Sequence, residues 1–123
     1  MPPYTAEGVA EIRAGLQRNR AQRDKGLAQR KKDALAGARR AAAMIRERHE
    51  CKVWLFGSLA RNGAFNEHSD IDLALEGLPA ATNFWSLYAD ALALAEPLNL
   101  DLVLLESASP ELQRKIRQEG VEI

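Results

Sequence analysis

The segment that most constrains the fold is a long stretch without proline, from Thr5 to about Arg48. Ala, Arg, Gln, Lys and Glu dominate it, and these residues favour helix. Three glycines, Gly15, Gly26 and Gly37, recur every 11 residues, and each costs about 1 kcal/mol relative to alanine inside a helix. The stretch therefore predicts either one continuous rod or two helices joined near Asp24–Gly26, and the composition fits both.

Charge divides the chain into two parts. Residues 1–50 carry 12 Lys and Arg against 6 Asp and Glu, and residues 51–123 carry 5 against 11, so the net charges are +6 and −6. A basic arm joined to an acidic body is typical of a contact surface for nucleic acid or for an acidic partner, and a solvated helix of mixed charge accounts for it equally well. Because the arm has few apolar residues, we expect it to be ordered on a partner surface. The apolar residues of the arm are Val9, Ile12, Leu16, Leu27 and Leu35.

The remainder of the chain has the pattern of a small domain of alternating strands and helices. We expect strands at 53–56, 70–75 and 98–105, a helix from Asn83 to Glu96 that ends at Pro97, and a helix that begins at Ser109–Pro110 and stops at Gly120. This order predicts an α/β (α+β) fold with a mixed sheet flanked by helices. We expect residues 1–32 to form a basic helical extension and residues 33–123 to form the domain.

No signal indicates a secreted, membrane or zinc protein. The single cysteine, Cys51, can form no internal disulfide, no leader sequence opens the chain, and the apolar runs are short, whereas a membrane span needs about 20 apolar residues. His49 and His68 have no zinc-type spacing with Cys51. We therefore expect a soluble cytoplasmic protein.

Three aspartates are the main candidates for chemistry. Asp70 and Asp72 stand at i and i+2, so they share one face of a strand, and two aligned carboxylates repel each other unless a cation lies between them. Asp101 interrupts the apolar run of the third strand and joins them if that strand pairs beside the second. Three carboxylates can hold two Mg²⁺ ions roughly 3.5–4 Å apart, as in phosphoryl transfer. Ala74, next on the same face, is expected to leave space.

Gly57 and Ser58, after the first strand, are candidates for binding phosphate. A glycine there lets backbone N–H groups approach a phosphate closely, and Ser58 adds a hydroxyl donor. We expect a short helix from Ser58 to Arg61, whose N-terminus favours an anion. Arg61 either contacts phosphate or pairs with an acid of the core. His68 could assist from the loop, although a solvated loop histidine fits its position better.

These residues together resemble a known signature. Gly57-Ser58-Leu59-Ala60-Arg61, followed by Ser69-Asp70-Ile71-Asp72-Leu73, looks like the motif of the DNA polymerase β-like nucleotidyltransferases, most closely the minimal nucleotidyltransferases (MNT) of bacteria and archaea. The similarity covers roughly residues 33–123. The loop before Asp70 is one residue longer than is usual in the family, with Asn62 in place of a glycine and Gly63 displaced, and a loop insertion explains both differences.

The resemblance implies roles for the site residues. Gly57 and Ser58 bind the phosphates of a nucleotide, and Asp70, Asp72 and Asp101 bind two Mg²⁺ ions and support catalysis. We group Arg61 with the nucleotide-binding residues. The implied reaction moves a nucleoside monophosphate, in the first place AMP from ATP, onto a hydroxyl of an acceptor.

The acceptor is expected on a second chain, because the sequence ends soon after its last helix. The resemblance implies a HEPN toxin as that partner, with this chain as the antitoxin that adenylylates it. The arm could also join two copies of the chain. Two other functions stay open: an antitoxin that acts by contact alone with a vestigial active site, and a nucleic-acid-binding subunit that uses the basic arm.

Overall fold

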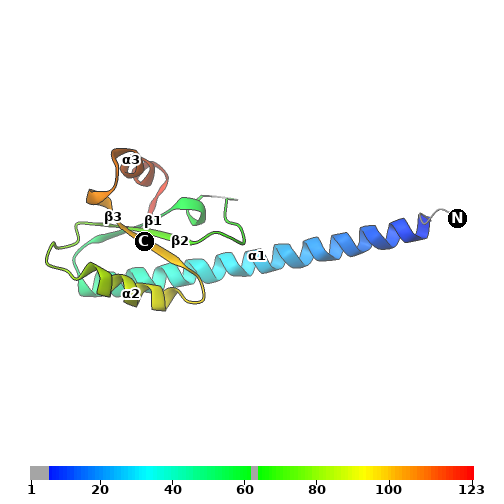
Figure 1. The fold of residues 1–123 in the computed structure, drawn as a ribbon, viewed down its shortest axis with the longest axis horizontal. Helices are drawn as coiled ribbons and strands as arrows, with labels where there is room; N and C mark the ends of the chain where they lie inside the picture. Colours follow the sequence, from blue (N-terminus) through cyan, green and yellow to red (C-terminus); the bar gives the residue numbers. More distant parts are fainter. Residues whose placement is uncertain (1–5, 62–63) are drawn as a thin grey trace.

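The computed structural model describes residues 6–61 and 64–123. The expected helix start at Thr5 and the inserted loop residues Asn62 and Gly63 lie outside the described residues. A four-stranded sheet lies between two helical layers: α1 and α2 cover one face, and α3 covers the other (Figure 1). None of the helices in the described part of the chain is long and apolar enough to cross a membrane.

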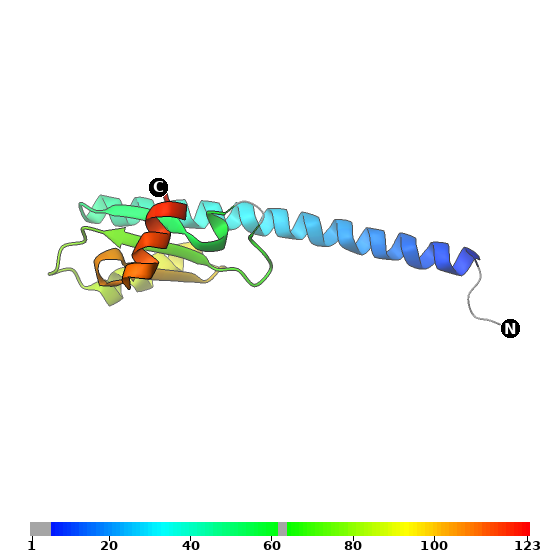
Figure 2. The same ribbon diagram turned by 90° about the horizontal axis from the view of Figure 1, so that it is seen from above.

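The basic stretch forms one helix, α1 (Ala6–Arg48). Of the two arrangements that the sequence left open, the continuous rod is therefore correct. The C-terminal part of α1 packs on the sheet, while its N-terminal part continues beyond the sheet and the other helices (Figures 1 and 2). In that protruding part, Ile12 and Leu16 are 61% and 62% exposed. The hydrophobic residues of α1 that are buried in the core are Ala34, Ala38, Ala41, Ala42 and Ile45.

The sheet has the strand order β3-β2-β1-β4. Its strands are β1 (Lys52–Phe56), β2 (Ile71–Glu76), β3 (Leu100–Leu104) and β4 (Val121–Glu122). β1 runs antiparallel to both β2 and β4, whereas β2 and β3 are parallel. Parallel neighbours need a crossover connection, and α2 (Phe84–Ala95) provides it. The mixed sheet flanked by helices agrees with the fold class expected from the sequence.

The strands and helices follow the predicted order, with differences at their ends. The third strand begins at Leu100 rather than residue 98, because the amide of Leu98 donates to Ala95 O at 3.0 Å and closes the turn after α2. Strand β4 was not predicted, since two residues carry no periodic pattern. The last helix, α3 (Pro110–Glu119), is capped as expected by Ser109, whose side chain accepts from the amide of Leu112 at 3.1 Å.

The two faces of β2 are both covered along most of the strand. Ile71, Leu73 and Leu75 are fully buried in the core beneath α1 and α2. Ala74, on the opposite face, is also fully buried, in a smaller cluster with Ile116 of α3 and with Leu105, which lies in the 3₁₀ turn after β3. The expectation that Ala74 leaves space is therefore wrong, because α3 packs over it. The candidate acids lie beyond this covered part, at the end of the face where β2 begins.

Candidate active site

The three aspartates come from the start of β2 and from its parallel neighbour. Asp72 lies directly opposite Asp101 in the register of β2 and β3. Asp70 immediately precedes β2, and the amide that follows it, Ile71 N–H, donates to Asn99 O at 3.0 Å. Asp70 and Asp72 are partly buried and Asp101 is exposed. The strand pairing on which the sequence prediction depended is therefore present.

The carboxylates act on one another electrostatically. The pKa of Asp72 is raised from 3.8 to about 6, first by burial and then by the negative charges of Asp101 and Asp70. A carboxylate among like charges is costly to ionise unless an opposite charge compensates it. This end of the sheet therefore favours binding of either a proton or a cation.

Gly57 turns the chain sharply beside Asp72. It follows Phe56, the register partner of Asp72, and its φ of +74° lies in the left-handed region that favours glycine. A Cβ at this position would clash with Oδ2 of Asp72. Both the backbone conformation and the close approach of the carboxylate therefore require a glycine.

The segment after Gly57 is a 3₁₀ turn rather than the expected helix from Ser58 to Arg61. The turn spans Gly57–Leu59, and the amide of Ala60 donates to Gly57 O at 3.2 Å. The side chain of Leu59 is buried in the core and holds the turn against it. Ser58, between Gly57 and Leu59 in the sequence, is partly buried.

Neither Arg61 nor His68 forms an ion pair with the three aspartates in the described part of the chain. Arg61 is exposed, and no ion pair within residues 6–61 and 64–123 includes it, so it does not hold an acid of the core. The side chain of His68 is 89% exposed and lies 3.7 Å from the carboxylate of Glu67. This position agrees with a solvated loop histidine.

Two residues contact the site without having been singled out from the sequence. The hydroxyl of Tyr88, on α2, lies 2.9 Å from Leu100 O and 3.3 Å from Oδ1 of Asp101. Burial raises the pKa of Tyr88, and Asp101 adds to the rise, so the tyrosine stays protonated and can donate to the carboxylate. Arg30, on α1, donates from Nη2 to Ser69 O at 2.9 Å. No sequence pattern marks either residue, because both contacts join elements that are distant along the chain.

The donor set suits Mg²⁺ in its chemistry. Carboxylate oxygens are the ligands that Mg²⁺ takes from proteins, and a cation would relieve the repulsion that raises the pKa of Asp72. As the side chains of the described residues stand, however, no three Asp, Glu, His or Cys are grouped closely enough to hold a metal. Asp101 is turned toward Tyr88. The residues therefore fit Mg²⁺ provided that the carboxylates turn toward one another.

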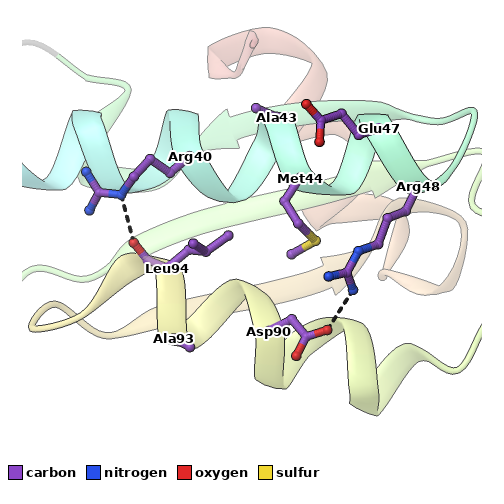
Figure 3. A pocket seen from close by; sticks show the side chains of 8 residues that line it. All are labelled: Arg40, Ala43, Met44, Glu47, Arg48, Asp90, Ala93 and Leu94. Atoms are coloured by element: carbon purple, nitrogen blue, oxygen red, sulfur yellow. Dashed lines mark hydrogen bonds and ion pairs between the residues drawn. The ribbon is translucent and has the colours of Figure 1, made fainter.

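A separate hollow of about 570 Å³ lies between α1 and α2 (Figure 3). Two contacts cross it: Arg48 pairs with Asp90 at 2.6 Å, and Arg40 Nε donates to Leu94 O at 3.1 Å. None of the three candidate aspartates lines it. The hollow is therefore a feature of the helical layer and not part of the candidate active site.

Comparison with solved structures gives neighbours of similar fold. A re-refined structure of a tri-AMPylated Shewanella oneidensis HEPN toxin in complex with MNT antitoxin matches at 24% identity and a TM-score of 0.52, over 70% of this chain and 67% of that chain. The toxin–antitoxin MntA–HpeT, in a variant with two Asp-to-Glu substitutions, matches at 26% identity and a TM-score of 0.55, over 69% of this chain and 70% of that chain. A toxin–antitoxin structure with AMP-PNP has a TM-score of 0.48, and 57% of that chain is covered, a likeness too low to carry an argument.

Comparison by sequence gives a family. None of the curated proteins compared with the chain matches it. The family described as polymerase beta, nucleotidyltransferase matches residues 44–123, a region that contains β1, the Gly57 turn and all three candidate aspartates. Because this match spans well over half of the sequence, the chain belongs to the polymerase β nucleotidyltransferase family.

Proposed function

We propose that this chain transfers AMP from ATP to a hydroxyl group of a partner protein, and that Asp70, Asp72 and Asp101 carry the reaction with Mg²⁺. The observation that carries the proposal is the pairing of Asp72 with Asp101 across β2 and β3, beside a turn that only glycine can make. Family membership supports the reaction class. The choice of AMP rests on the MNT resemblance and on the AMP-modified toxin in one structural neighbour.

In the proposed site, Asp70 and Asp72 would hold Mg²⁺ from the start of β2, and Asp101 would complete the ligand set once its side chain leaves Tyr88. The cation would supply charge that neutralises the triphosphate and polarises the reacting oxygens. The backbone N–H groups of the Gly57 turn and the hydroxyl of Ser58 bind the phosphates. Arg61, exposed two residues after the 3₁₀ turn, is the cation available to the triphosphate from solvent.

The proposed chemistry is a single substitution at the α-phosphorus of ATP. The acceptor oxygen forms a bond to the α-phosphorus while the bond to the bridging oxygen breaks, and pyrophosphate leaves with the electron pair. The proton of the acceptor hydroxyl passes to the carboxylate of Asp101. Because Asp101 is exposed at the edge strand β3, a hydroxyl on another chain can reach it.

The partner that we propose is a HEPN-domain toxin, with this chain as its antitoxin. Structural neighbours of this chain are toxin–antitoxin complexes, one of them between an MNT antitoxin and a HEPN toxin that carries AMP. Modification of the toxin by this chain is then the means of neutralisation. The alternative is neutralisation by contact alone, and a test has to separate the two.

The test uses the purified chain, Mg²⁺, ATP labelled at the α-phosphate and a HEPN-domain protein encoded beside it. The wild-type chain should transfer label to the HEPN protein, and Asp70→Asn combined with Asp72→Asn should abolish transfer. Glu111→Gln, an exposed acid in the first turn of α3, is the matched control and should behave as wild type. Equal labelling by the double variant would refute the assignment of the acids. Neutralisation of the toxin by the double variant, without labelling, would favour the contact mechanism.

A further inference from the structure

Arg30 links α1 to the loop that leads into the candidate acids. Its guanidinium donates from Nη2 to Ser69 O at 2.9 Å, and its Cζ lies 5.9 Å from the centroid of the Phe65 ring. An arginine at this distance from an aromatic ring is attracted to it electrostatically. Arg30 stands within residues 1–32, the segment expected to be an extension, yet its contacts are with the loop before β2.

The loop that receives Arg30 is closed on itself. Ser69 is only 9% exposed. Its hydroxyl accepts from the amide of Asn66 at 2.9 Å, and its own amide donates to Asn66 O at 3.1 Å. Phe65, beneath the guanidinium, is buried in the core. The turn from Asn66 to Ser69 is therefore a compact unit, and Arg30 fastens it to α1.

The carbonyl that accepts from Arg30 belongs to the peptide group that joins Ser69 to Asp70. On the other side of Asp70, the amide of Ile71 donates to Asn99 O at 3.0 Å. The two peptide groups that flank Asp70 are therefore each held by a partner from a different element. Because peptide groups are planar, holding both of them limits the directions that the Asp70 side chain can take.

Arg30 holds the loop by a hydrogen bond to the main chain and does not neutralise a negative charge. Its acceptor is a neutral main-chain carbonyl, and the ion pairs formed among residues 6–61 and 64–123 do not include it. Its Nε is buried without an acceptor among those residues, which carries a cost. The arginine keeps this position through the Ser69 carbonyl and the Phe65 ring.

We propose that Arg30 is a positioning residue for Asp70: by holding the carbonyl of Ser69, it sets the direction in which the Asp70 carboxylate leaves the start of β2 and thereby the affinity of the acids for a divalent cation. This inference rests on the proposed function. Removal of a residue that orients a metal ligand costs about 10- to 100-fold in metal affinity or activity, so the effect is large enough to measure.

The experiment compares three variants of the full chain. Arg30→Met removes the donors while keeping a long side chain, and Arg30→Lys restores one donor and the charge. Lys32→Met is the matched control, because Lys32 is an exposed cation two residues away on the same helix. Binding of Mn²⁺, followed by electron paramagnetic resonance, reports on the acids without requiring turnover. Hydrogen exchange of peptides covering residues 64–72 reports on the loop.

Arg30→Met should weaken Mn²⁺ binding at least about tenfold and speed exchange in residues 64–72. In the transfer assay it should raise the Mg²⁺ concentration needed for half-maximal rate while leaving the affinity for metal-free ATP unchanged. Arg30→Lys should recover most of the Mn²⁺ affinity, and it keeps the proposal testable if Arg30→Met does not fold. Lys32→Met should match wild type in every measurement.

Unchanged Mn²⁺ affinity and unchanged exchange in Arg30→Met would overturn the proposal, and so would an equal loss in Lys32→Met. If Arg30 controls Mn²⁺ affinity and loop exchange but the wild-type chain transfers no nucleotide to any partner, the positioning role stands and the proposed transfer is refuted. A wild-type chain that binds no Mn²⁺ overturns both.

Discussion

Gly57 and Asp72 constrain each other, although 15 positions separate them in the sequence. The register of β1 and β2 places Asp72 opposite Phe56, the residue before the glycine. The glycine has a positive φ, and its missing side chain makes room for Oδ2 of Asp72. A glycine at a strand end and an acid on the next strand thus form one structural unit.

Gly57→Ala should therefore destabilise the protein more than a positive φ alone explains. Gly77→Ala is the matched control, because Gly77 has a φ of +82° and a Cβ there would meet nothing within 4 Å. The left-handed conformation costs a non-glycine residue about 1–2 kcal/mol, so both variants should lose about this much stability. In urea unfolding, we expect Gly57→Ala to lower the free energy of unfolding more than Gly77→Ala does. Adding Asp72→Ala to Gly57→Ala should recover the extra loss, because it removes the carboxylate that the new methyl group meets. Equal losses for both glycines would argue against the steric conflict with Asp72.

The raised pKa of Asp72 predicts a definite pH dependence of stability. The native carboxyl binds its proton more tightly than the unfolded one, since the pKa is about 6 rather than 3.8. The free energy of unfolding of the metal-free protein should therefore fall as the pH rises through that window. Asp72→Asn should remove this fall, stabilise the metal-free protein at neutral pH and lower nucleotidyl transfer by orders of magnitude. Urea unfolding at several pH values tests the first two effects, and a wild-type transfer rate in the variant would exclude Asp72 from catalysis.

At the scale of elements, α1 has two parts in different surroundings. From Ala34 onward its inner face packs in the core, so tertiary contacts stabilise it. Its N-terminal part has few contacts, and there the helix depends on the propensity of its own residues. The three evenly spaced glycines therefore have different consequences: a Cβ at Gly37 would lie 3.4 Å from Cα of Ala95, whereas a Cβ at Gly26 would meet nothing within 4 Å.

Gly26→Ala should stabilise the helix locally by about 1 kcal/mol, because alanine loses less backbone freedom than glycine. The effect should appear as slower hydrogen exchange around residue 26 and as a higher helix content in far-UV circular dichroism. Gly37→Ala is the contrasting variant, since its new methyl group must fit against the α2 backbone and should cancel part of the gain. Faster exchange around residue 26 in Gly26→Ala would contradict the prediction that helix propensity governs the stability of this part of α1.

At the scale of the whole molecule, the N-terminal part of α1 extends beyond the sheet and the other helices (Figures 1 and 2). It combines exposed Ile12 and Leu16 with a predominance of cations. We predict that it lies along a partner chain, either the acceptor protein or a second copy, with apolar residues at the centre and arginines at the rim.

Deleting residues 1–26 should abolish complex formation and leave a folded domain that keeps Arg30 in contact with Ser69. Deleting residues 1–32 should in addition weaken divalent-cation binding, because it removes Arg30. The salt dependence of binding distinguishes a protein partner from nucleic acid. The affinity for nucleic acid falls log-linearly with salt concentration, whereas the affinity of an apolar protein contact changes little. Co-purification of the 1–26 deletion with the partner at full stoichiometry would show that the interface lies elsewhere.

Prediction from the sequence succeeded where the signal is local and failed where it is not. The strand at β2 followed from the alternation around Ile71 and Leu73, and the cap at Ser109 followed from Ser-Pro. The burial of Ala74 could not be predicted, because it depends on α3 packing over a residue 36 positions earlier than Pro110. The length of β3 was overestimated, since Leu98 has the composition of a strand but donates to the turn after α2.

The sequence by itself determined the order of the elements from β1 to α3 and the charge division between arm and body, and it singled out the three aspartates as candidates, because periodicity, turn residues and motif spacing are properties of neighbouring positions. Tertiary structure alone decided that Asp72 faces Asp101 across parallel strands, and that Tyr88 and Arg30 reach the candidate site. These contacts depend on how helices pack against the sheet. Arg30 is one of twelve cations in the first 50 residues, and only the folded loop before Asp70 distinguishes it from the others.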